Sequence, residues 1–176
     1  MQNIRMKVTV QKVISEVTAA FPARRAAPFE PIVNSGQGDE PMLTAVAFAD
    51  KDDWTILDWK WLDEAADGWA SALSFLSDKA ACFYIPAYMV ADMNDALERV
   101  DPTFPLTLGF DDFSRGSPIS PHRPETWTEH SATRWSHLTK AQAQAVAHYL
   151  EWRLSLDDLG IEQALRSFWH GRVAGG

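Results

Sequence analysis

The sequence predicts a mostly α-helical fold, a single domain over residues 1–176 arranged as a helical bundle around a central helix that contains a proline. Three observations lead to this prediction. Apolar residues recur at steps of three and four between residues 8 and 21, which is the period of one helix face. Residues 80–91 are uncharged and follow a serine that can cap a helix. A third periodic run, at 141–155, follows a threonine of the same kind. The length also suits one domain.

The N-terminal part of the chain is predicted as two helices separated by a loop. The first helix covers 8–21 and ends before Pro22. Residues 22–38 contain three prolines and two glycines, which is typical of irregular structure. An acidic pair followed by a proline at 39–41 then indicates the start of a second helix, which we expect to reach about Ala49.

The segment from Trp54 to Ala66 contains so many large apolar residues that no period can be assigned to it. We predict a turn there, followed by a short helix from Asp58 to about Gly68. The chain then enters its least charged region, which begins near Leu73.

The central helix is predicted from its cap, Ser77, to about Leu97. It is apolar on almost every side between residues 80 and 90, so it should be buried. A proline in a helix interior costs about 3 kcal/mol, because it lacks an amide donor and clashes with the carbonyl of the preceding turn. We therefore expect a kink at Pro86, and packing of this helix against the first helix and the helix at 139–155.

Residues 102–135 are predicted to be a long irregular loop. Five prolines, two glycines and many hydroxyl residues lie in it. Leu106–Phe110 has the composition of a short strand, but no partner strand is apparent. Beyond the helix at 139–155, Gly160 precedes a last helix that we expect from Ile161 to about Trp169. The two ends of the chain are expected to be flexible, at 1–7 and 172–176.

The net charge of −8 is concentrated between Asp39 and Asp112. A nucleic-acid-binding protein would carry a basic stripe instead, so that class is not expected. An acidic face suits a basic protein partner, whose approach it accelerates by electrostatic steering. The alternative is that the acidic residues only keep the protein soluble.

The single cysteine, Cys82, excludes an intrachain disulfide and any cysteine-based metal cluster. It lies in the uncharged stretch, where a thiol is normally a small buried apolar group. The N-terminus lacks the apolar stretch of a signal peptide, and the longest uncharged run is too short to cross a bilayer. We therefore expect a cytoplasmic protein that makes no membrane contact.

Four of the eight tryptophans lie within sixteen residues, from Trp54 to Trp69. Six acidic residues surround them, namely Asp50, Asp52, Asp53, Asp58, Asp63 and Glu64. The cluster has two interpretations: the indoles fill a helical core, or some of them are interface anchors at the rim of an acidic surface. On the second interpretation the protein is a non-enzymatic acidic module that binds a basic protein partner. The expected partner surface consists of Asp52, Asp53, Trp54, Asp58, Trp59, Trp61 and Asp63.

No nucleotide-binding, hydrolase or zinc-binding motif is present, so we predict no catalytic residue, no metal ligand and no cofactor. The first alternative function is a small metal-dependent or carboxylate/histidine hydrolase that uses the 102–137 segment. Its candidate residues are His122, His130, His137, Asp111 and Asp112. A second alternative is a structural subunit of a helical assembly.

The most specific pattern in the chain is Leu-Ser-Phe-Leu-Ser at 73–77, followed by Phe-Tyr-Ile-Pro-Ala-Tyr-Met at 83–89 and Ala-Asp at 91–92. With Ala20-Phe21 before it and Leu138-Thr139 with Gln142 after it, this order resembles an uncharacterised bacterial domain-of-unknown-function family (6714-like). Leucines are more usual in that family at the positions of Ile85 and Met89. The resemblance covers much of residues 13–155.

The resemblance implies a helical fold and brings no catalytic residues. Small families of this kind often contain immunity or accessory proteins of bacterial conflict systems. Together with the charge of the chain, this leads us to expect an immunity or antitoxin-type protein that binds and neutralises a basic toxin.

Overall fold

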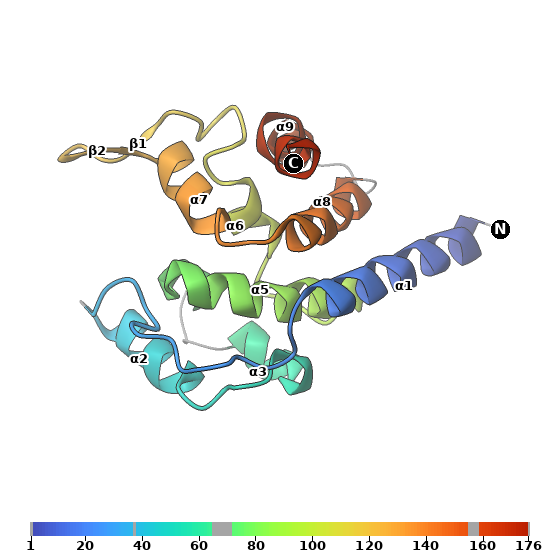
Figure 1. The fold of residues 1–176 in the computed structure, drawn as a ribbon, viewed down its shortest axis with the longest axis horizontal. Coiled ribbons are helices and arrows are strands. Elements are labelled where there is room, and N and C mark those ends of the chain that lie inside the picture. Colours follow the sequence, from blue (N-terminus) through green and yellow to red (C-terminus); the bar gives the residue numbers. More distant parts are fainter. Residues whose placement is uncertain (1, 37, 65–71, 155–158, 176) are drawn as a thin grey trace. The chain divides into compact units, whose positions relative to one another are not determined.

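A computed structural model describes residues 2–36, 38–64, 72–154 and 159–175, with side chains from residue 10 onward. The prediction of a mostly helical protein is confirmed, since helices dominate and a two-stranded hairpin accompanies them (Figure 1). The chain forms two compact units. We call residues 21–102 the middle unit and residues 1–20 with 103–176 the terminal unit. A single domain over 1–176 stays a prediction.

The middle unit is built on helix α5, against which the shorter elements pack (Figure 1). Its elements in order are α2 (Asp39–Phe48), η1 (Trp54–Ile56), α3 (Trp59–Glu64), α4 (Ala72–Phe75) and α5 (Asp78–Met93). Helix α2 begins where the acidic pair and proline predicted it. Helix α3 begins one residue after Asp58, and its predicted end near Gly68 lies outside the described residues.

Helix α5 is the core of the middle unit, with eleven of its sixteen residues buried, including Cys82. It continues through Pro86, and the kink there stays a prediction. Ser77 occupies the N-cap as predicted, but its side chain makes no capping hydrogen bond. Its backbone N–H instead donates to the carbonyl of Ile32 at 2.9 Å, which ties the helix start to the loop before α2.

Helix α5 ends four residues before the predicted Leu97, because Asp95 adopts the left-handed conformation with φ of 57°. The N–H of Ala96 donates to the carbonyl of Ala91 at 3.0 Å, and that of Asp95 to Asp92 at 2.9 Å. These two bonds form a Schellman motif, which satisfies the last carbonyls of the helix.

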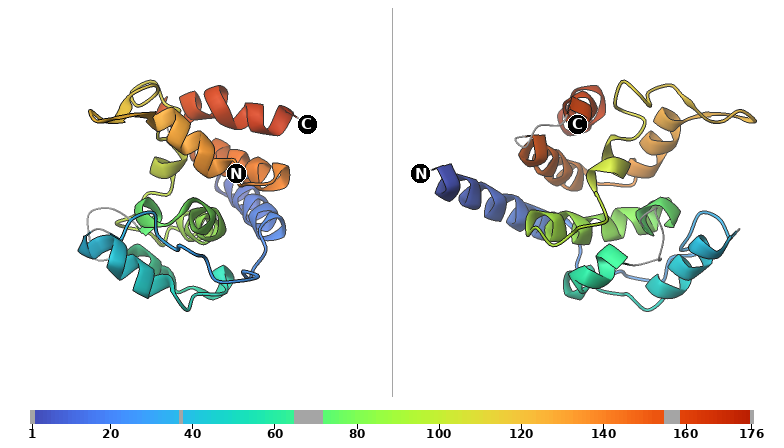
Figure 2. Two further views of the ribbon diagram at one scale, coloured as in Figure 1. Left: turned by 60° about the vertical axis from the view of Figure 1, so that its left-hand side comes forward. Right: turned by 180° about the vertical axis from the view of Figure 1, so that it is seen from behind.

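The terminal unit combines the first helix with the C-terminal half of the chain (Figure 2). Helix α1 packs along α8, which also contacts α9, η2 and α10. Its elements are α1 (Gln2–Ala20), α6 (Thr103–Thr107), β1 (Pro118–Ser120), β2 (Arg123–Thr126), α7 (Trp127–Trp135), α8 (Lys140–Leu154), α9 (Leu159–Ala164), the π-helix η2 (Leu165–Trp169) and α10 (His170–Ala174). The first helix thus starts six residues earlier than the periodicity indicated.

The prediction of an irregular loop over 102–135 is wrong, because this segment contains α6, the β1–β2 hairpin and α7. Specific polar contacts, which the amino-acid composition does not reveal, stabilise the segment 102–135. Thr126 and Glu129 form a capping box at the start of α7, and the Nε1 atoms of Trp135 and Trp169 donate to carbonyls of α6 at 3.2 and 2.9 Å. Leu106–Phe110, considered as a strand, is the end of α6 and a turn.

The predicted threonine cap of α8 is confirmed. The Oγ1 of Thr139 accepts from the N–H of Gln142 at 3.2 Å, and the Gln142 side chain accepts from the N–H of Thr139 at 2.9 Å. This reciprocal pair is a capping box, and it satisfies two amides that the first turn of α8 would otherwise leave unpaired.

Candidate functional site

Asp52 and Asp53 lie in the turn that joins α2 to η1, and both are bound to arginines of the loop after α1. Arg25 donates to Asp52 at 2.7 Å and to the carbonyl of Ala49 at 2.6 Å, while Arg24 donates to Asp53 at 3.2 Å. The sequence predicted these two aspartates as partner contacts. In the structure their charges are already compensated within the unit.

Asp53 also caps the short helix η1. Its Oδ1 accepts from the hydroxyl of Thr55 at 2.6 Å and from the N–H of Thr55 at 2.9 Å. The hydroxyl of Thr55 is the main reason that the pKa of Asp53 is lowered. A carboxylate that accepts several hydrogen bonds prefers its charged form, so Asp53 is ionised at neutral pH.

Trp54 is buried, with 4% of its surface exposed, and its Nε1 donates to the carbonyl of Pro22 at 2.8 Å. The prediction that it contributes to a partner surface is therefore wrong: it is a core residue of the middle unit. Trp69 lies outside the described residues. The remaining two tryptophans of the cluster are both on α3.

Trp61 is half-buried and belongs to the packing between α2 and α3. Its ring lies 5.0 Å from that of Phe48, and the ammonium of Lys51 lies over it at 5.3 Å. The same ammonium pairs with Asp50, whose pKa is lowered by this hydrogen bond. The hydroxyl of Tyr84 donates to the carbonyl of Lys51, and burial raises its pKa to about 12, so it stays protonated.

Asp58 and Asp63 position the ends of α3. The Oδ1 of Asp58 accepts from the N–H of Trp61 at 2.8 Å and so caps the helix. The Oδ1 of Asp63 accepts from the N–H groups of Arg99 and Val100 at 2.9 and 3.0 Å. These bonds bring the segment after α5 beside α3.

An open pocket of about 550 Å³ lies between α3 and that segment. Four acidic side chains, one lysine and three apolar residues line it: Asp58, Asp63, Glu64, Glu98, Lys60, Leu57, Trp59 and Ala96. The indole of Trp59 is 41% exposed. The pocket thus unites Asp58, Trp59 and Asp63 from the predicted surface, and leaves out Asp52, Asp53, Trp54 and Trp61.

Sequence reasoning did not find Glu98 as a member of the site. It lies 34 residues beyond Glu64, and the hydrogen bonds from Arg99 and Val100 to Asp63 hold its segment beside α3. No spacing in the sequence indicates such a backbone contact.

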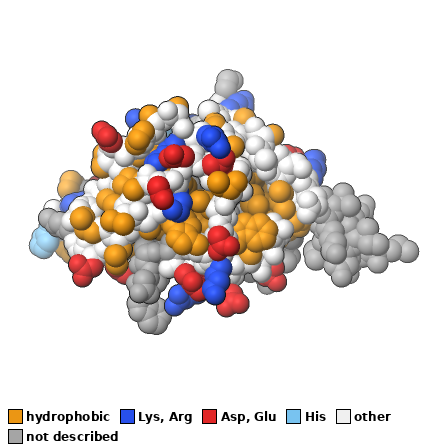
Figure 3. All heavy atoms as spheres, turned by 90° about the horizontal axis from the view of Figure 1, so that it is seen from below, with side chains coloured by type: hydrophobic (Ala, Val, Ile, Leu, Met, Phe, Trp, Pro, Cys, Tyr) orange, Lys and Arg blue, Asp and Glu red, His pale blue; other side chains and the backbone are white. Residues whose placement is uncertain are grey.

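The acidity of the chain belongs to the middle unit. That unit carries fifteen acidic and six basic side chains, a net charge of −9, whereas the terminal unit carries nine and ten, a net charge of +1. Seen from the side of α2 and α3, acidic side chains lie among exposed hydrophobic ones and among Lys and Arg side chains (Figure 3). The field around the α3 pocket is therefore negative.

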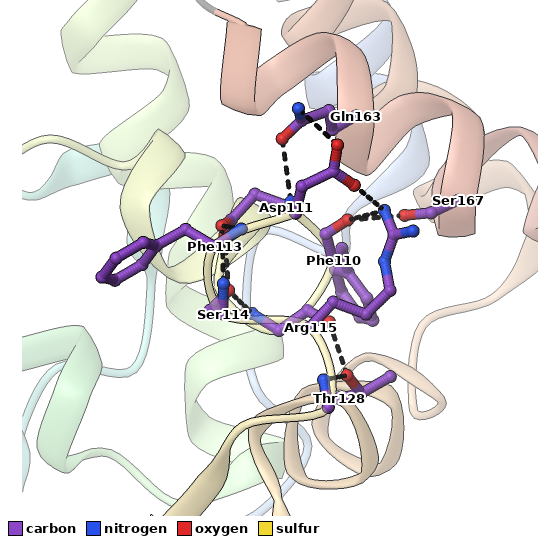
Figure 4. Close-up of polar contacts among 11 residues, drawn as sticks. Phe110, Asp111, Phe113, Ser114, Arg115, Thr128, Gln163 and Ser167 are labelled. Atoms are coloured by element: carbon purple, nitrogen blue, oxygen red, sulfur yellow. Dashed lines mark hydrogen bonds and ion pairs between the residues drawn. The ribbon is translucent and has the colours of Figure 1, made fainter.

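The carboxylates of the alternative hydrolase site are engaged by residues of their own loop and by Gln163 of α9 (Figure 4). Asp111 accepts from the N–H groups of Phe113 and Ser114, each at 2.9 Å, and from the Ser114 hydroxyl at 2.5 Å. Asp112 pairs with Arg115 at 3.0 Å and accepts from the side chain of Gln163 at 2.8 Å. These contacts fold the turn after α6.

The three candidate histidines of that site lie at separate positions in the terminal unit. His130 is on α7, 3.7 Å from Glu125 and edge-on to Trp127. His122 is in the hairpin turn and His137 is exposed after α7. Across the parts of the chain that the structure describes, no three His, Cys, Asp or Glu side chains are placed to hold a metal ion.

The fold and the pocket define a mostly helical protein with an acidic, tryptophan-bearing recess on its middle unit. Residues 36–173 match the model of DUF6714, a family of unknown function. The chain belongs to this family, as the resemblance of its central pattern indicated. No curated protein and no solved structure matches the chain. Within the described ranges, none of the helices has the length and apolar character needed to cross a membrane.

Proposed function

We propose that the protein is a non-enzymatic binding module that receives a basic protein partner at the α3 pocket. The observation that carries this proposal is the composition of the pocket, four carboxylates beside one exposed indole. Carboxylates accept charge-assisted hydrogen bonds from arginine and lysine, and an indole face attracts the same cations. The pocket suits a basic side chain that protrudes from a protein surface.

The pocket is also held in place before a partner arrives. Asp58 and Asp63 each use one carboxylate oxygen, Oδ1, to accept backbone N–H groups. Their side chains are thus fixed, so less side-chain freedom is lost on binding than for mobile carboxylates. A tryptophan at the rim is a typical anchor of a protein interface.

An immunity or antitoxin-type protein that neutralises a basic toxin is the form of this function that we favour. The net charge of −9 on the middle unit supports it, because opposite charge accelerates the capture of a partner. Fast capture matters for a protein that must bind a toxin before the toxin acts.

The experiment is a pull-down from the lysate of the host at moderate salt, followed by association kinetics with the captured protein. We expect one basic partner in equal amount, released at high salt. The variant Glu64→Gln/Glu98→Gln should bind this partner more slowly, with a weaker dependence on salt. Both residues are exposed, so the variant should fold normally.

The matched control is Glu151→Gln/Glu162→Gln, which removes the same charge from the terminal unit. It should retain most of the association rate. Equal slowing by both variants would attribute the effect to net charge, and an unchanged rate in the pocket variant would reject the pocket as the binding site.

A further inference from the structure

Helix α2 has an unusual outer face. Its inner face buries Pro41, Thr44 and Phe48, at the spacing of one helix stripe. The opposite face of a surface helix is normally polar or charged. Here it carries Met42, Leu43 and Val46, which are 53%, 52% and 73% exposed.

These three side chains form a continuous strip, which we call the α2 strip. Met42 and Val46 are four residues apart and Leu43 lies beside them, so they share one side of the helix. No charged residue lies between Pro41 and Ala49. Contiguous apolar side chains on a surface mark an interaction site more often than isolated ones do.

The charged side chains at the start of the α2 strip are acidic. Residues 26–50 contain four acidic residues and no Lys, Arg or His. Asp39 and Glu40 stand in the first turn of α2, and Asp50, whose side chain is 79% exposed, follows its end. Asp50 pairs with the ammonium of Lys51, so an occupant that covers the strip meets its net negative charge at the start of α2, at Asp39 and Glu40.

This arrangement disfavours a second copy of the chain as the occupant. Two α2 helices packed antiparallel would place Asp39 and Glu40 of one copy against the Asp50–Lys51 ion pair of the other, which has no net charge. Packed parallel, they would place the same acids opposite each other. Parallel packing brings like charges together, which is destabilising, and antiparallel packing gives Asp39 and Glu40 no net positive charge to pair with.

We propose that the α2 strip is the docking site for an amphipathic helix of the basic partner, with an apolar face between lysines or arginines. This inference rests on the proposed function and adds the structural class of the contact. The ridge formed by Met42 and Val46 fits the groove of a second helix. The basic residues of that helix then pair with Asp39 and Glu40 at the start of α2.

The test uses a defined probe, a synthetic peptide with leucines on one helical face and lysines on the other, and a scrambled peptide of the same composition. Binding is measured by fluorescence anisotropy at moderate salt. The wild-type protein should prefer the amphipathic peptide. In Leu43→Gln/Val46→Gln that preference should fall about tenfold, because two apolar contacts are lost.

Two further variants separate this inference from its alternatives. Phe113→Gln removes a 95% exposed phenylalanine from the terminal unit and should retain the preference. Glu64→Gln/Glu98→Gln should weaken both peptides alike and leave the preference intact. Equal binding of the two peptides by the wild type, or an unchanged preference in the α2 variant, would overturn the docking site. The α3 pocket is tested separately, by the association kinetics of its own variant.

Discussion

Two acidic segments look alike in the sequence and differ in the fold. Asp111-Asp112 follows α6 in the terminal unit, and Asp63-Glu64 ends α3 in the middle unit. Asp111 uses both carboxylate oxygens for N–H and hydroxyl donors of its own turn. Asp63 uses Oδ1 for a distant backbone segment, and Glu64 lines an open pocket.

The difference shows what decides the role of an acidic pair. A tight turn presents its own N–H groups to a preceding aspartate, and this satisfies the carboxylate locally. A helix end has no such donors in reach of its acidic side chains, because its last N–H groups are already bonded within the helix. At the end of α3, Asp63 therefore accepts its N–H donors from a distant segment, and Glu64 lines the open pocket.

The largest expected loss of stability comes from a substitution in the turn that contains Asp111. Gly109 has φ of +85°, and a Cβ there would lie 2.4 Å from the carbonyl oxygen of Trp127. Gly109→Ala should cost at least about 3 kcal/mol of unfolding free energy in urea titrations, from backbone strain and the clash. Gly116→Ala is the control, since its φ is +71° with open space around it, and it should cost about 1–2 kcal/mol. Equal losses would mean that the contact with Trp127 carries no energy.

A second prediction separates the two neighbouring aspartates. Asp111→Ala leaves the buried hydroxyl of Ser114 without its acceptor and should lower the unfolding free energy by about 2 kcal/mol. Asp112→Ala removes a half-exposed ion pair with Arg115 and an exposed hydrogen bond from Gln163, and should cost less than about 1 kcal/mol. The measurement is thermal and urea unfolding of both variants. A larger loss in Asp112→Ala would show that the turn depends on the surface pair instead.

A third prediction concerns the stability contribution of Asp53 in the middle unit, which depends on pH. Asp53→Ala removes the cap of η1 and should cost about 1 kcal/mol at neutral pH. Because the pKa of Asp53 is lowered in the folded state, its contribution is complete above 3.8, the ordinary value, and is lost as the pH falls through the folded pKa. Urea unfolding of the variant and the wild type at a series of pH values should therefore converge in acid. A gap that persists in strong acid would exclude the carboxylate as its source.

The helices that carry their own capping and periodicity were predictable from the sequence. Helix α2 follows from an acidic pair and a proline, and α8 from Thr139 with Gln142. The segment 102–135 was not, because its order depends on contacts between distant residues, such as the indole of Trp169 with α6. One local indication was available: Thr126 and Glu129 have the spacing of a capping box.

The site was predictable only in part. The local density of tryptophans and acids identified α3, and three of the seven expected contact residues line the pocket. The expectation that Trp54 lies at the surface fails because composition does not show whether an indole N–H donates to a backbone carbonyl inside the unit or lies at the edge of an interface. Here it donates to the carbonyl of Pro22. The place of Glu98 in the pocket was not predictable, because it depends on the path of the chain after the left-handed residue Asp95.

The burial of Cys82 gives the middle unit an internal reporter. It is the one cysteine in the sequence, and it is 8% exposed on α5. A thiol reagent can modify it at an appreciable rate only when this helix opens, so the rate of alkylation under native conditions measures that opening. A partner that binds the middle unit should slow the labelling. The opening of α5 can therefore be followed in the unaltered protein, without an engineered probe.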